Sequence, residues 1–390
     1  MKKYYLDNAA TTPLHPEVAA CMAESLINDY ANPSSMYDMG IETEKKIEAV
    51  RAQIAKQINA LPEEITFTSG GTEGDNTIIR GVIENIRPAQ RKNIRIITTT
   101  IEHPAVKDVF RYFEEKDIEV IWLPVDHEGK IDLDYFKSVM NENTVLVSVI
   151  GVHNEIGTIQ DLSAIGTVIK TVNPDCVFHS DYVQGFMKEP LNVKKCQLDA
   201  VTMCAHKICG PKGVGAIYIR KGVPVKPLLL GGGQEKGFRS GTENISGILG
   251  FGKAVEKMAE GGQALHDRLA DYKQRMIDAF SEMADVSING AADGSPYVLN
   301  VSFAGLRGEV LLHSLEKQGV YISTGSACST HKKDKGLIQK AIGLAPEYAE
   351  GSIRISFSQL TTEKEVTEAT QIIIQAVQQL RKWMKFNNKK

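Results

Sequence analysis

The stretch that decides the fold runs from residue 144 to residue 184 and reads TVLVSVIGVHNEIGTIQDLSAIGTVIKTVNPDCVFHSDYVQ. Two apolar runs rich in β-branched residues, TVLVSVIGV and CVFHSDYVQ, flank a segment of helical character. Neither run alternates strictly between apolar and polar residues, which is typical of strands that are covered on both faces. A strand, a helix and a second strand in this order predict a parallel sheet with helices packed on it.

The same alternation extends outward, from about residue 40 to residue 220. The segment 40–60 places Ile47, Val50, Ile54 and Ile58 on one face of an amphipathic helix. Further strand-like runs are EITFTSG, IRIITTT and IEVIWLPV before the central stretch, and LDAVTMCA and VGAIYIRK after it. We therefore predict an α/β fold with a mainly parallel, helix-covered sheet.

The character of the chain changes after GGGQEKGFRSGTEN at 231–244. A long helix candidate follows, then two strand-like runs, YVLNVSF and GVYIST, and a last helix that Thr362 and Glu365 open with a capping-box pattern. A length of 390 residues suits two domains, since a domain has roughly 150 residues as a prior. We predict a large domain over residues 15–260 and a small α+β domain over residues 1–14 and 261–390.

Composition and charge narrow the class of protein. The chain is 42% hydrophobic and its 45 basic and 48 acidic residues are mixed, which argues against a footprint for nucleic acid or an anionic membrane. Its longest apolar run, VLVSVIGV at 145–152, is far shorter than the ~20 residues that span a bilayer. The start, MKKYYLDNAATTP, lacks the apolar run of a secretory signal. The six cysteines have no zinc or disulfide spacing. We expect a cytoplasmic protein without a metal site.

Glycines and hydroxyls meet where a strand-like run enters a helix, at Ser69, Gly70, Gly71 and Thr72. Backbone N–H groups at a helix N-terminus, reached through glycines, can bind an anion such as phosphate. The spacing matches neither a Walker A loop nor a GxGxxG fingerprint, which leaves another phosphate ligand. An ordinary strand–turn–helix joint explains the same residues.

Asp181 and Lys207 each lie at the end of a strand-like run. Ligands of α/β sheets bind outside the carboxyl ends of the strands, so Asp181 can face a bound cofactor there, or it can cap a following helix. A desolvated lysine loses its proton readily and can attack an aldehyde, although most lysines are merely solvated. An anion site, an acid for a pyridine nitrogen and a lysine for an aldehyde together meet the needs of pyridoxal phosphate (PLP).

The chain resembles the cysteine desulfurases of the NifS and IscS type, which are fold-type I, aspartate aminotransferase-like PLP enzymes of the class-V aminotransferase family. The motifs that carry the resemblance run in order along nearly the whole chain: YLDNAATTP, NPSS, FTSGGTEGDN, IEHPAV, NEIGTIQD, HSDYVQ, AHKICGPKGVGAIYIRKG, GGGQEKGFRSGTEN, NVSFAGLRGEVLL, STGSACST and GSIRISFS. The resemblance implies PLP as cofactor, L-cysteine as substrate, L-alanine and a persulfide on Cys328 as products, and a homodimer.

The resemblance also implies roles for single residues. Lys207 would hold PLP and move a proton, Asp181 would face the pyridine nitrogen, and His103 would stack on the ring as a proton donor or acceptor. Arg354 would grip the substrate carboxylate, a task that suits its bidentate fork. The other implied cofactor-binding positions are Gly71, Thr72, Asn154, Gln184, Cys204, His206 and Thr242, of which the last reaches the neighbouring subunit's phosphate. Softer candidates for the substrate and cofactor environment are Asn8, Asn32 and Ser34.

Some positions depart from the family pattern. Cys204 and Ala205 stand where the family has Ser-Gly, and because a thiol is the weaker hydrogen-bond donor, one phosphate contact should weaken. Tyr37 replaces a histidine and Tyr182 an alanine. Side chains alternate along a strand, so Tyr182 should face away from the acid before it. The residues that the chemistry needs most are all present.

Cys328 lies among small residues at 325–329, which predicts a mobile segment that carries sulfur to an outside acceptor. The basic run at 331–335 departs from the family's Leu-Glu-Pro-Ser, and it can lower the thiol pKa, meet an acidic acceptor surface or be merely solvated. The acceptor stays open between an iron–sulfur scaffold, a tRNA-thiolation protein and a cofactor pathway. The alternatives are a selenocysteine lyase, another fold-type I PLP enzyme, and a PLP-binding protein that has lost catalysis.

Overall fold

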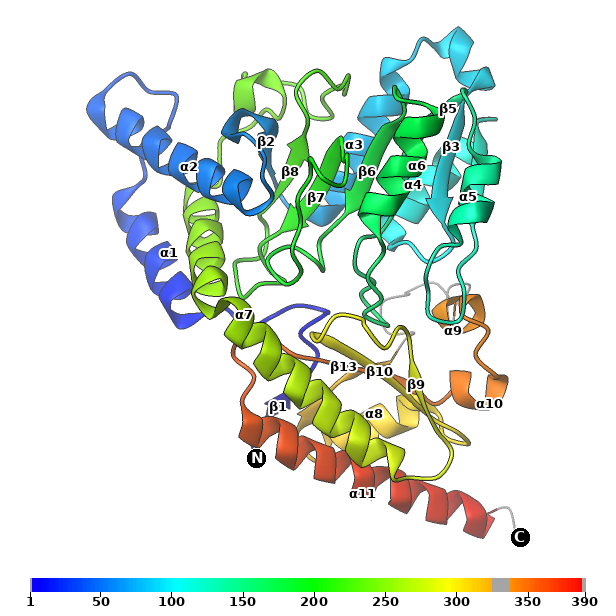
Figure 1. Cartoon of the computed structure of the whole chain (residues 1–390). Coiled ribbons are helices and arrows are strands. Elements are labelled where there is room, and N and C mark those ends of the chain that lie inside the picture. Colours follow the sequence, from blue (N-terminus) through cyan, green and yellow to red (C-terminus); the bar gives the residue numbers. More distant parts are fainter. Residues whose placement is uncertain (1, 325–336, 388–390) are drawn as a thin grey trace.

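A mainly parallel sheet of seven strands forms the centre of the larger part of the molecule (Figure 1). The computed structural model describes residues 2–324 and 337–387. In spatial order the strands are β2 (Ile65–Thr68), β8 (Gly215–Ile219), β7 (Ala200–Cys204), β6 (Val177–Asp181), β5 (Thr144–Ser148), β3 (Arg95–Thr99) and β4 (Glu119–Leu123). Strand β8 pairs antiparallel with both of its neighbours, while β7, β6, β5, β3 and β4 pair in parallel. The expected α/β sheet is therefore confirmed.

Helices cover both faces of this sheet (Figure 1). Their bounds are α1 (Pro16–Asn28), α2 (Asp38–Gln57), α3 (Gly71–Asn85), α4 (Pro104–Glu114), α5 (Leu133–Val139), α6 (Leu162–Val172) and α7 (Ile245–Ser281), with short 3-10 turns η1 (Pro62–Glu64), η2 (Pro88–Asn93) and η3 (Glu235–Gly237). The face predicted for α2 is buried at Ile47, Val50, Ile54 and Ile58. The middle strands β6 and β7 are buried along their whole length because helices shield them on both sides.

Helix α3 lies close to the sheet because glycines stand at two positions near its start, Gly71 and Gly74. A Cβ atom added at Gly74 would lie 2.7 Å from Thr202 Cγ2 on β7 and 2.9 Å from Ile217 Cγ2 on β8. A Cβ atom at Gly71 would lie 2.8 Å from Val183 Cγ2. The glycines thus set the distance at which the first turn of α3 approaches the strand ends.

A smaller antiparallel sheet lies below the large one (Figure 1), in the order β12 (Ser323–Thr324), β13 (Ser352–Ser356), β10 (Val298–Phe303) and β9 (Val286–Asn289). The first strand of the chain, β1 (Tyr4–Tyr5), pairs in parallel with β11 (Val320–Tyr321) beside it. The helices of this part are α8 (Gly308–Glu316), α9 (Leu337–Ala341), α10 (Pro346–Ala349) and α11 (Glu363–Asn387). The N-terminal segment therefore lies against the C-terminal part of the chain.

The expected capping box opens α11. The Thr362 backbone amide donates to Glu365 Oε2 (2.8 Å), and the Glu365 amide donates to Thr362 Oγ1 (3.3 Å). Behind this cap, the stripe of Val366, Ala369, Ile373 and Val377 is buried, and Leu380 packs partly buried against the same core.

The long helix α7 joins the two parts of the molecule (Figure 1). It breaks at Gly262, whose backbone angles of φ 46° and ψ −141° are not helical and suit a glycine. The division into residues 15–260 and residues 1–14 with 261–390 stays a prediction, which the two sheets and this break support. Within the described ranges 2–324 and 337–387, each helix is too short or too polar to cross a bilayer.

Candidate active site

The predicted residues meet at the carboxyl ends of neighbouring parallel strands. Asp181 is the last residue of β6, Lys207 follows β7, Asn154 follows β5, His103 follows β3 and Gly71 follows β2. Because β7, β6, β5 and β3 are adjacent and parallel, their following segments share one edge of the sheet. This edge is the place where ligands bind in open α/β sheets.

The Lys207 amine is held at this edge by the N-terminal segment. Its Nζ donates to the carbonyl oxygens of Ala9 (2.6 Å) and Ala10 (2.8 Å), and the side chain is half-buried. Two main-chain acceptors thus keep the amine pointed at the strand ends. Lys207 is an anchored amine rather than a solvated one.

Asp181 is a buried acid, with only 4% of the residue exposed. Its Oδ1 accepts a hydrogen bond from the Val183 amide (3.0 Å), and turns follow β6. The alternative that Asp181 caps a helix is therefore wrong. Burial raises the pKa of Asp181, while the nearby His103 and Lys207 lower it. A cationic ring nitrogen beside this carboxylate would offset the cost of its burial.

His103 is the N-cap of α4, and its Nδ1 accepts from the Ala105 backbone amide (3.2 Å). A neutral imidazole that accepts at Nδ1 carries its hydrogen on Nε2. Burial is the main cause that lowers the pKa of His103, and Asp181 opposes it. His103 therefore presents a neutral ring whose Nε2–H can donate to a ligand.

The first turn of α3 fits an anion. Its N-cap, Gly70, lacks a side chain, so the amides of Gly71 and Thr72 point outward without a side-chain cap. Beside them, the Ser69 amide donates to Glu73 (2.8 Å), and Arg239 neutralises Glu73 through a 2.9 Å ion pair. The start of α3 therefore has free backbone amides and no net negative side chain beside them, as the phosphate hypothesis requires.

Two further candidates for phosphate binding lie near the end of β7: Cys204 is its last residue and His206 follows it. Burial lowers the pKa of His206 to about 3, so this imidazole is neutral, and its Nδ1 lies 3.1 Å from Thr11 Oγ1. Burial raises the pKa of Cys204 to about 11, so the thiol stays protonated. Neither residue brings a charge to the anion site. Neutral N–H and hydroxyl donors would therefore bind the phosphate.

Arg354 reaches the site from the small sheet. The residue is 2% exposed, its Nη2 pairs with Asp7 Oδ1 (2.8 Å), and its Nη1 donates to the Asn154 carbonyl (3.1 Å). Its Nε, although buried, has no partner in the described part of the chain. This guanidinium can therefore donate hydrogen bonds to a further carboxylate.

Asn8 lies beside this pair and is buried. Its Nδ2 donates to the carbonyls of Tyr5 (3.1 Å) and Ser356 (2.8 Å), while its Oδ1 has no partner among the described residues. Asn8 thus ties the N-terminal segment to β13. Gln184 ties the same segment to the large sheet, since its Nε2 donates to the Ala9 carbonyl (2.8 Å).

Three other candidates are exposed and do not follow the strands of this edge: Asn32, Ser34 and Thr242. Asn32 Oδ1 accepts from the Ser34 amide (2.9 Å) in the loop between α1 and α2, and Thr242 lies just before α7. Ser34 and Glu243, the neighbour of Thr242, line one surface hollow of about 460 Å³. Ser34 and the chain neighbours of Asn32 and Thr242 thus surround one hollow. Cys328 and the run 331–335 lie outside the described residues.

The substitution at Tyr182 is accommodated by two glycines. Tyr182 is buried, and a Cβ atom would come within 2.3 Å of its ring at Gly151 and within 2.5 Å at Gly185. The aromatic ring occupies space that side chains at those positions would fill. Tyr37, by contrast, is exposed as the N-cap of α2.

Sequence reasoning missed several buried groups near the strand ends. Burial raises the pKa of Glu102 to about 8 and raises the pKa of Asp75, which the charge of Asp181 raises further. His179 Nε2 lies 3.7 Å from Asp75 Oδ1, but burial lowers the pKa of His179 to about 3, so this contact involves a neutral ring. Glu102 lies in the motif IEHPAV and Asp75 lies in FTSGGTEGDN. Their place in these motifs was the signal in the sequence that could have identified them as site residues.

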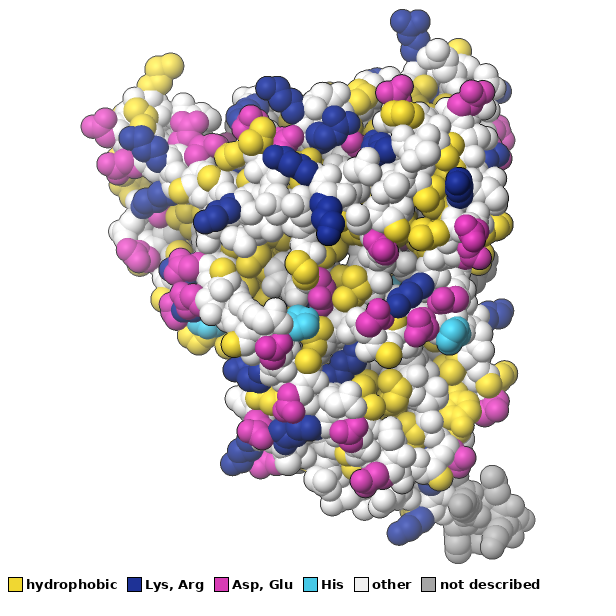
Figure 2. All heavy atoms as spheres, viewed as in Figure 1, with side chains coloured by type: hydrophobic (Ala, Val, Ile, Leu, Met, Phe, Trp, Pro, Cys, Tyr) yellow, Lys and Arg dark blue, Asp and Glu magenta, His cyan; other side chains and the backbone are white. Residues whose placement is uncertain are grey.

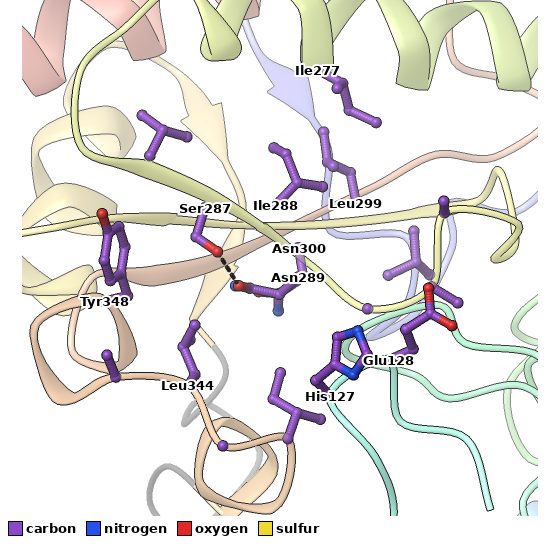
Figure 3. Close-up of a pocket in the computed structure, with 18 of the residues that line it drawn as sticks. His127, Glu128, Ile277, Ser287, Ile288, Asn289, Leu299, Asn300, Leu344 and Tyr348 are labelled. Carbon is purple, nitrogen blue, oxygen red and sulfur yellow. Dashed lines mark hydrogen bonds between the residues drawn. The ribbon is translucent and has the colours of Figure 1, made fainter.

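A larger cavity of about 620 Å³ lies between the loop at His127 and Glu128 and the small sheet (Figure 3). Ser287 Oγ donates to Asn289 Oδ1 (3.0 Å) on its wall. Asn300 connects this wall to the site, since its Nδ2 donates to the Glu155 carbonyl (3.1 Å) next to Asn154. Among the residues that the structure describes, no predicted site residue lines this cavity.

Comparison with known proteins places the chain in a family. The model of the family described as aminotransferase class-V matches residues 4–368. Cysteine desulfurase IscS of Clostridium botulinum is 38% identical over 384 residues, which cover 97% of this chain and 96% of that protein. A solved structure described as a NifS-like protein has a TM-score of 0.90 at 35% identity and covers 97% of this chain and 100% of its own. The structure of SspA in complex with cysteine has a TM-score of 0.80 at 29% identity, covering 92% and 100%.

The fold and the groups at the strand ends define a fold-type I PLP enzyme, as predicted. The chain belongs to the class-V aminotransferase family, with cysteine desulfurases as full-length relatives. Enzymes of this family depend on PLP, and the residues present fit it. A glycine-lined helix start, a buried acid and an anchored amine meet at one sheet edge.

Proposed function

We propose that the protein is a PLP-dependent cysteine desulfurase, which converts L-cysteine to L-alanine and leaves a persulfide on Cys328. The observation that carries the proposal is the anchored amine of Lys207 at the same strand edge as the buried Asp181. Full-length similarity to cysteine desulfurases at 38% identity supports it. The neighbouring structure of SspA in complex with cysteine supports cysteine as substrate.

Each of these residues would bind a different part of the cofactor. Asp181 would stabilise the protonated pyridine nitrogen, and the amides of Gly71 and Thr72 would bind the phosphate. Lys207 would hold the aldehyde carbon. When bound, PLP would supply an electron sink for the bond that breaks at the substrate's α-carbon.

Arg354 would orient the substrate by binding the substrate's carboxylate. The carboxylate would accept from Arg354 Nε, which has no partner among the described residues. The Lys207 amine then removes the α-proton and later returns a proton. His103 would present its Nε2–H as a donor to the reacting groups, because its Nδ1 accepts from the Ala105 amide.

Cys328 attacks as a thiolate at the sulfur of the substrate. A sulfur–sulfur bond forms while the carbon–sulfur bond breaks, so the electron pair of the broken bond stays with the substrate carbon. Protonation of that carbon gives L-alanine, and the transferred sulfur remains on Cys328 as a persulfide. The persulfide passes its outer sulfur to an acceptor, for which iron–sulfur cluster assembly is the role we favour over tRNA thiolation.

A homodimer with shared sites forms the second part of the proposal. Large apolar residues are exposed around the α1–α2 corner: Leu26, Ile27, Tyr30, Met36 and Tyr37. Hydrophobic side chains show at the upper left of the molecule in Figure 2. Exposed apolar patches of this kind mark protein interfaces. The hollow lined by Met36, Ser34 and Glu243 adjoins this corner. A second copy there would receive Asn32 and Thr242 next to its own strand ends.

A pair of substrates separates the main proposal from the lyase alternative. Purified wild-type protein with PLP and a thiol reductant should form alanine from L-cysteine, and Cys328→Ala should lose this activity. Cys196→Ala, at a half-buried position outside the site, is the matched control and should keep it. If Cys328→Ala keeps its activity on L-selenocysteine alone, a lyase role is favoured. Binding of PLP without turnover of either substrate would indicate lost catalysis.

A further inference from the structure

Lys188 is a buried lysine next to the candidate active site, in the segment between β6 and β7. Only 7% of the residue is exposed. Its Nζ donates to Gln184 Oε1 (3.2 Å) and lies 5.3 Å from the centre of the Tyr297 ring. Neither of these partners is a carboxylate, so the ammonium is held by an amide oxygen and an aromatic face.

The contact continues toward the catalytic amine. Gln184 Nε2 donates to the Ala9 carbonyl (2.8 Å), and the same carbonyl accepts from Lys207 Nζ (2.6 Å). One continuous chain of hydrogen bonds therefore runs from Lys188 through Gln184 and the Ala9 carbonyl to Lys207.

The ammonium fixes the acceptor end of the Gln184 amide. A glutamine amide has one acceptor oxygen and one donor nitrogen, whereas an ammonium only donates. Lys188 therefore holds Oε1 toward itself, and the Ala9 carbonyl, which only accepts, holds Nε2 on the other side. An apolar residue at position 188 would leave Oε1 without its donor and the Gln184 side chain fixed at one end only.

Packing alone does not explain a lysine at this position. Burial lowers the pKa of Lys188 to about 8, so keeping its charge costs folding free energy. The charge of Lys207 lowers this pKa as well, and Glu189 raises it. A methionine would fill a similar volume without that cost. The charge is therefore better explained by the donor that it provides.

We propose that Lys188 is a positioning residue, which orients Gln184 toward the bound PLP and steadies the Ala9 carbonyl that anchors Lys207. This inference rests on the proposed function, because it assigns Gln184 to the cofactor.

Lys188→Met tests the inference, with Lys273→Met as the matched control. Lys273 is half-buried, and burial lowers its pKa to about 8 as well. It donates to main-chain carbonyls at Ser295 (3.0 Å) and Gly294 (3.4 Å). We expect Lys188→Met to weaken PLP binding about tenfold, as the loss of a hydrogen bond to a charged group does, and to shift the visible absorbance of bound PLP. Lys273→Met should match the wild type in both.

The route through Gln184 has its own test. In a Gln184→Ala background, Lys188→Met should cause no further loss of PLP affinity, because the two residues act in series. Lys188→Arg, which keeps a donor, should restore part of the affinity and the wild-type absorbance.

The inference is overturned if Lys188→Met leaves the PLP dissociation constant and the absorbance band unchanged, or if Lys273→Met shifts both equally. If Lys188→Met does not fold, Gln184→Ala and Lys188→Arg decide: an unchanged band in Gln184→Ala, or a shifted band in Lys188→Arg, overturns it. Failure of the proposed function appears differently, as wild-type and Lys273→Met proteins that bind PLP and make no alanine.

Discussion

At the scale of single residues, the buried carboxyl of Glu102 should make stability depend on pH. Its Oε1 accepts from the Thr99 hydroxyl and the Ile150 amide, both at 2.8 Å, and burial raises its pKa from 4.5 to about 8. The folded state therefore holds this proton more tightly than the unfolded state. The resulting stabilisation is complete below pH 4.5 and is lost as the pH rises toward 8.

Glu102→Gln removes this dependence, since glutamine keeps the acceptor and has no proton to lose. The unfolding free energy of the variant minus that of the wild type should rise between pH 4.5 and pH 8, by about 4 kcal/mol. Urea unfolding at several pH values measures the difference. A difference that stays constant, or falls with pH, contradicts the assignment.

Cys204 offers a prediction about cofactor affinity. The thiol is buried at the end of β7, where the family pattern has a hydroxyl. Cys204→Ser should lower the PLP dissociation constant about three- to tenfold, because a hydroxyl donates a stronger hydrogen bond to phosphate. Cys176→Ser, at another buried cysteine, should leave PLP affinity unchanged. Equal affinities of Cys204→Ser and wild type would mean that this side chain does not contact the phosphate.

At the scale of elements, the close packing of α3 on β7 and β8 depends on Gly74. A Cβ atom there would lie 2.7 Å from Thr202 Cγ2, so Gly74→Ala should lower the unfolding free energy by about 1–3 kcal/mol. This loss opposes alanine's higher helix propensity. Asn85→Ala, at the exposed end of the same helix, should change stability by less than about 0.5 kcal/mol. A Gly74→Ala variant as stable as the wild type would show that α3 can move outward without cost.

The elements also show what could be predicted from the sequence. Apolar runs predicted the strands, and parallel strands gather their carboxyl ends, so Asp181, Lys207 and Gly71 could be placed at one edge. Apolar runs do not carry strand direction, and the antiparallel β8 was not foreseen. Nor did the long helical pattern mark the break at Gly262.

Contacts between distant segments were the least predictable. Asp7 meets Arg354 and the Ala9 carbonyl meets Lys207 because β1 pairs with β11 and carries the N-terminal segment across the sheet edge. No local pattern encodes that pairing. The buried state of Lys188 was hidden for the same reason, since Tyr297 comes from the other part of the chain.

At the scale of the whole molecule, the homodimer depends on the apolar α1–α2 corner. Met36 is 95% exposed and lines the hollow at this corner. Met36→Glu should therefore shift the protein from dimer to monomer in light scattering and reduce alanine formation at least tenfold, an order of magnitude typical for charge at an interface centre. Trp383→Glu, at a 75% exposed apolar residue on α11, should stay dimeric and active. A wild-type monomer contradicts the dimer, and a dimeric Met36→Glu contradicts this surface.

The most direct test of the central claim is a single turnover of the PLP-loaded protein with L-cysteine in the absence of a reductant. We predict one alanine per active site, together with a gain of one sulfur atom on Cys328, located by peptide mass spectrometry. Lys207→Ala should give neither product. Alanine without sulfur on Cys328, or a PLP-loaded protein that yields no alanine, would contradict the account.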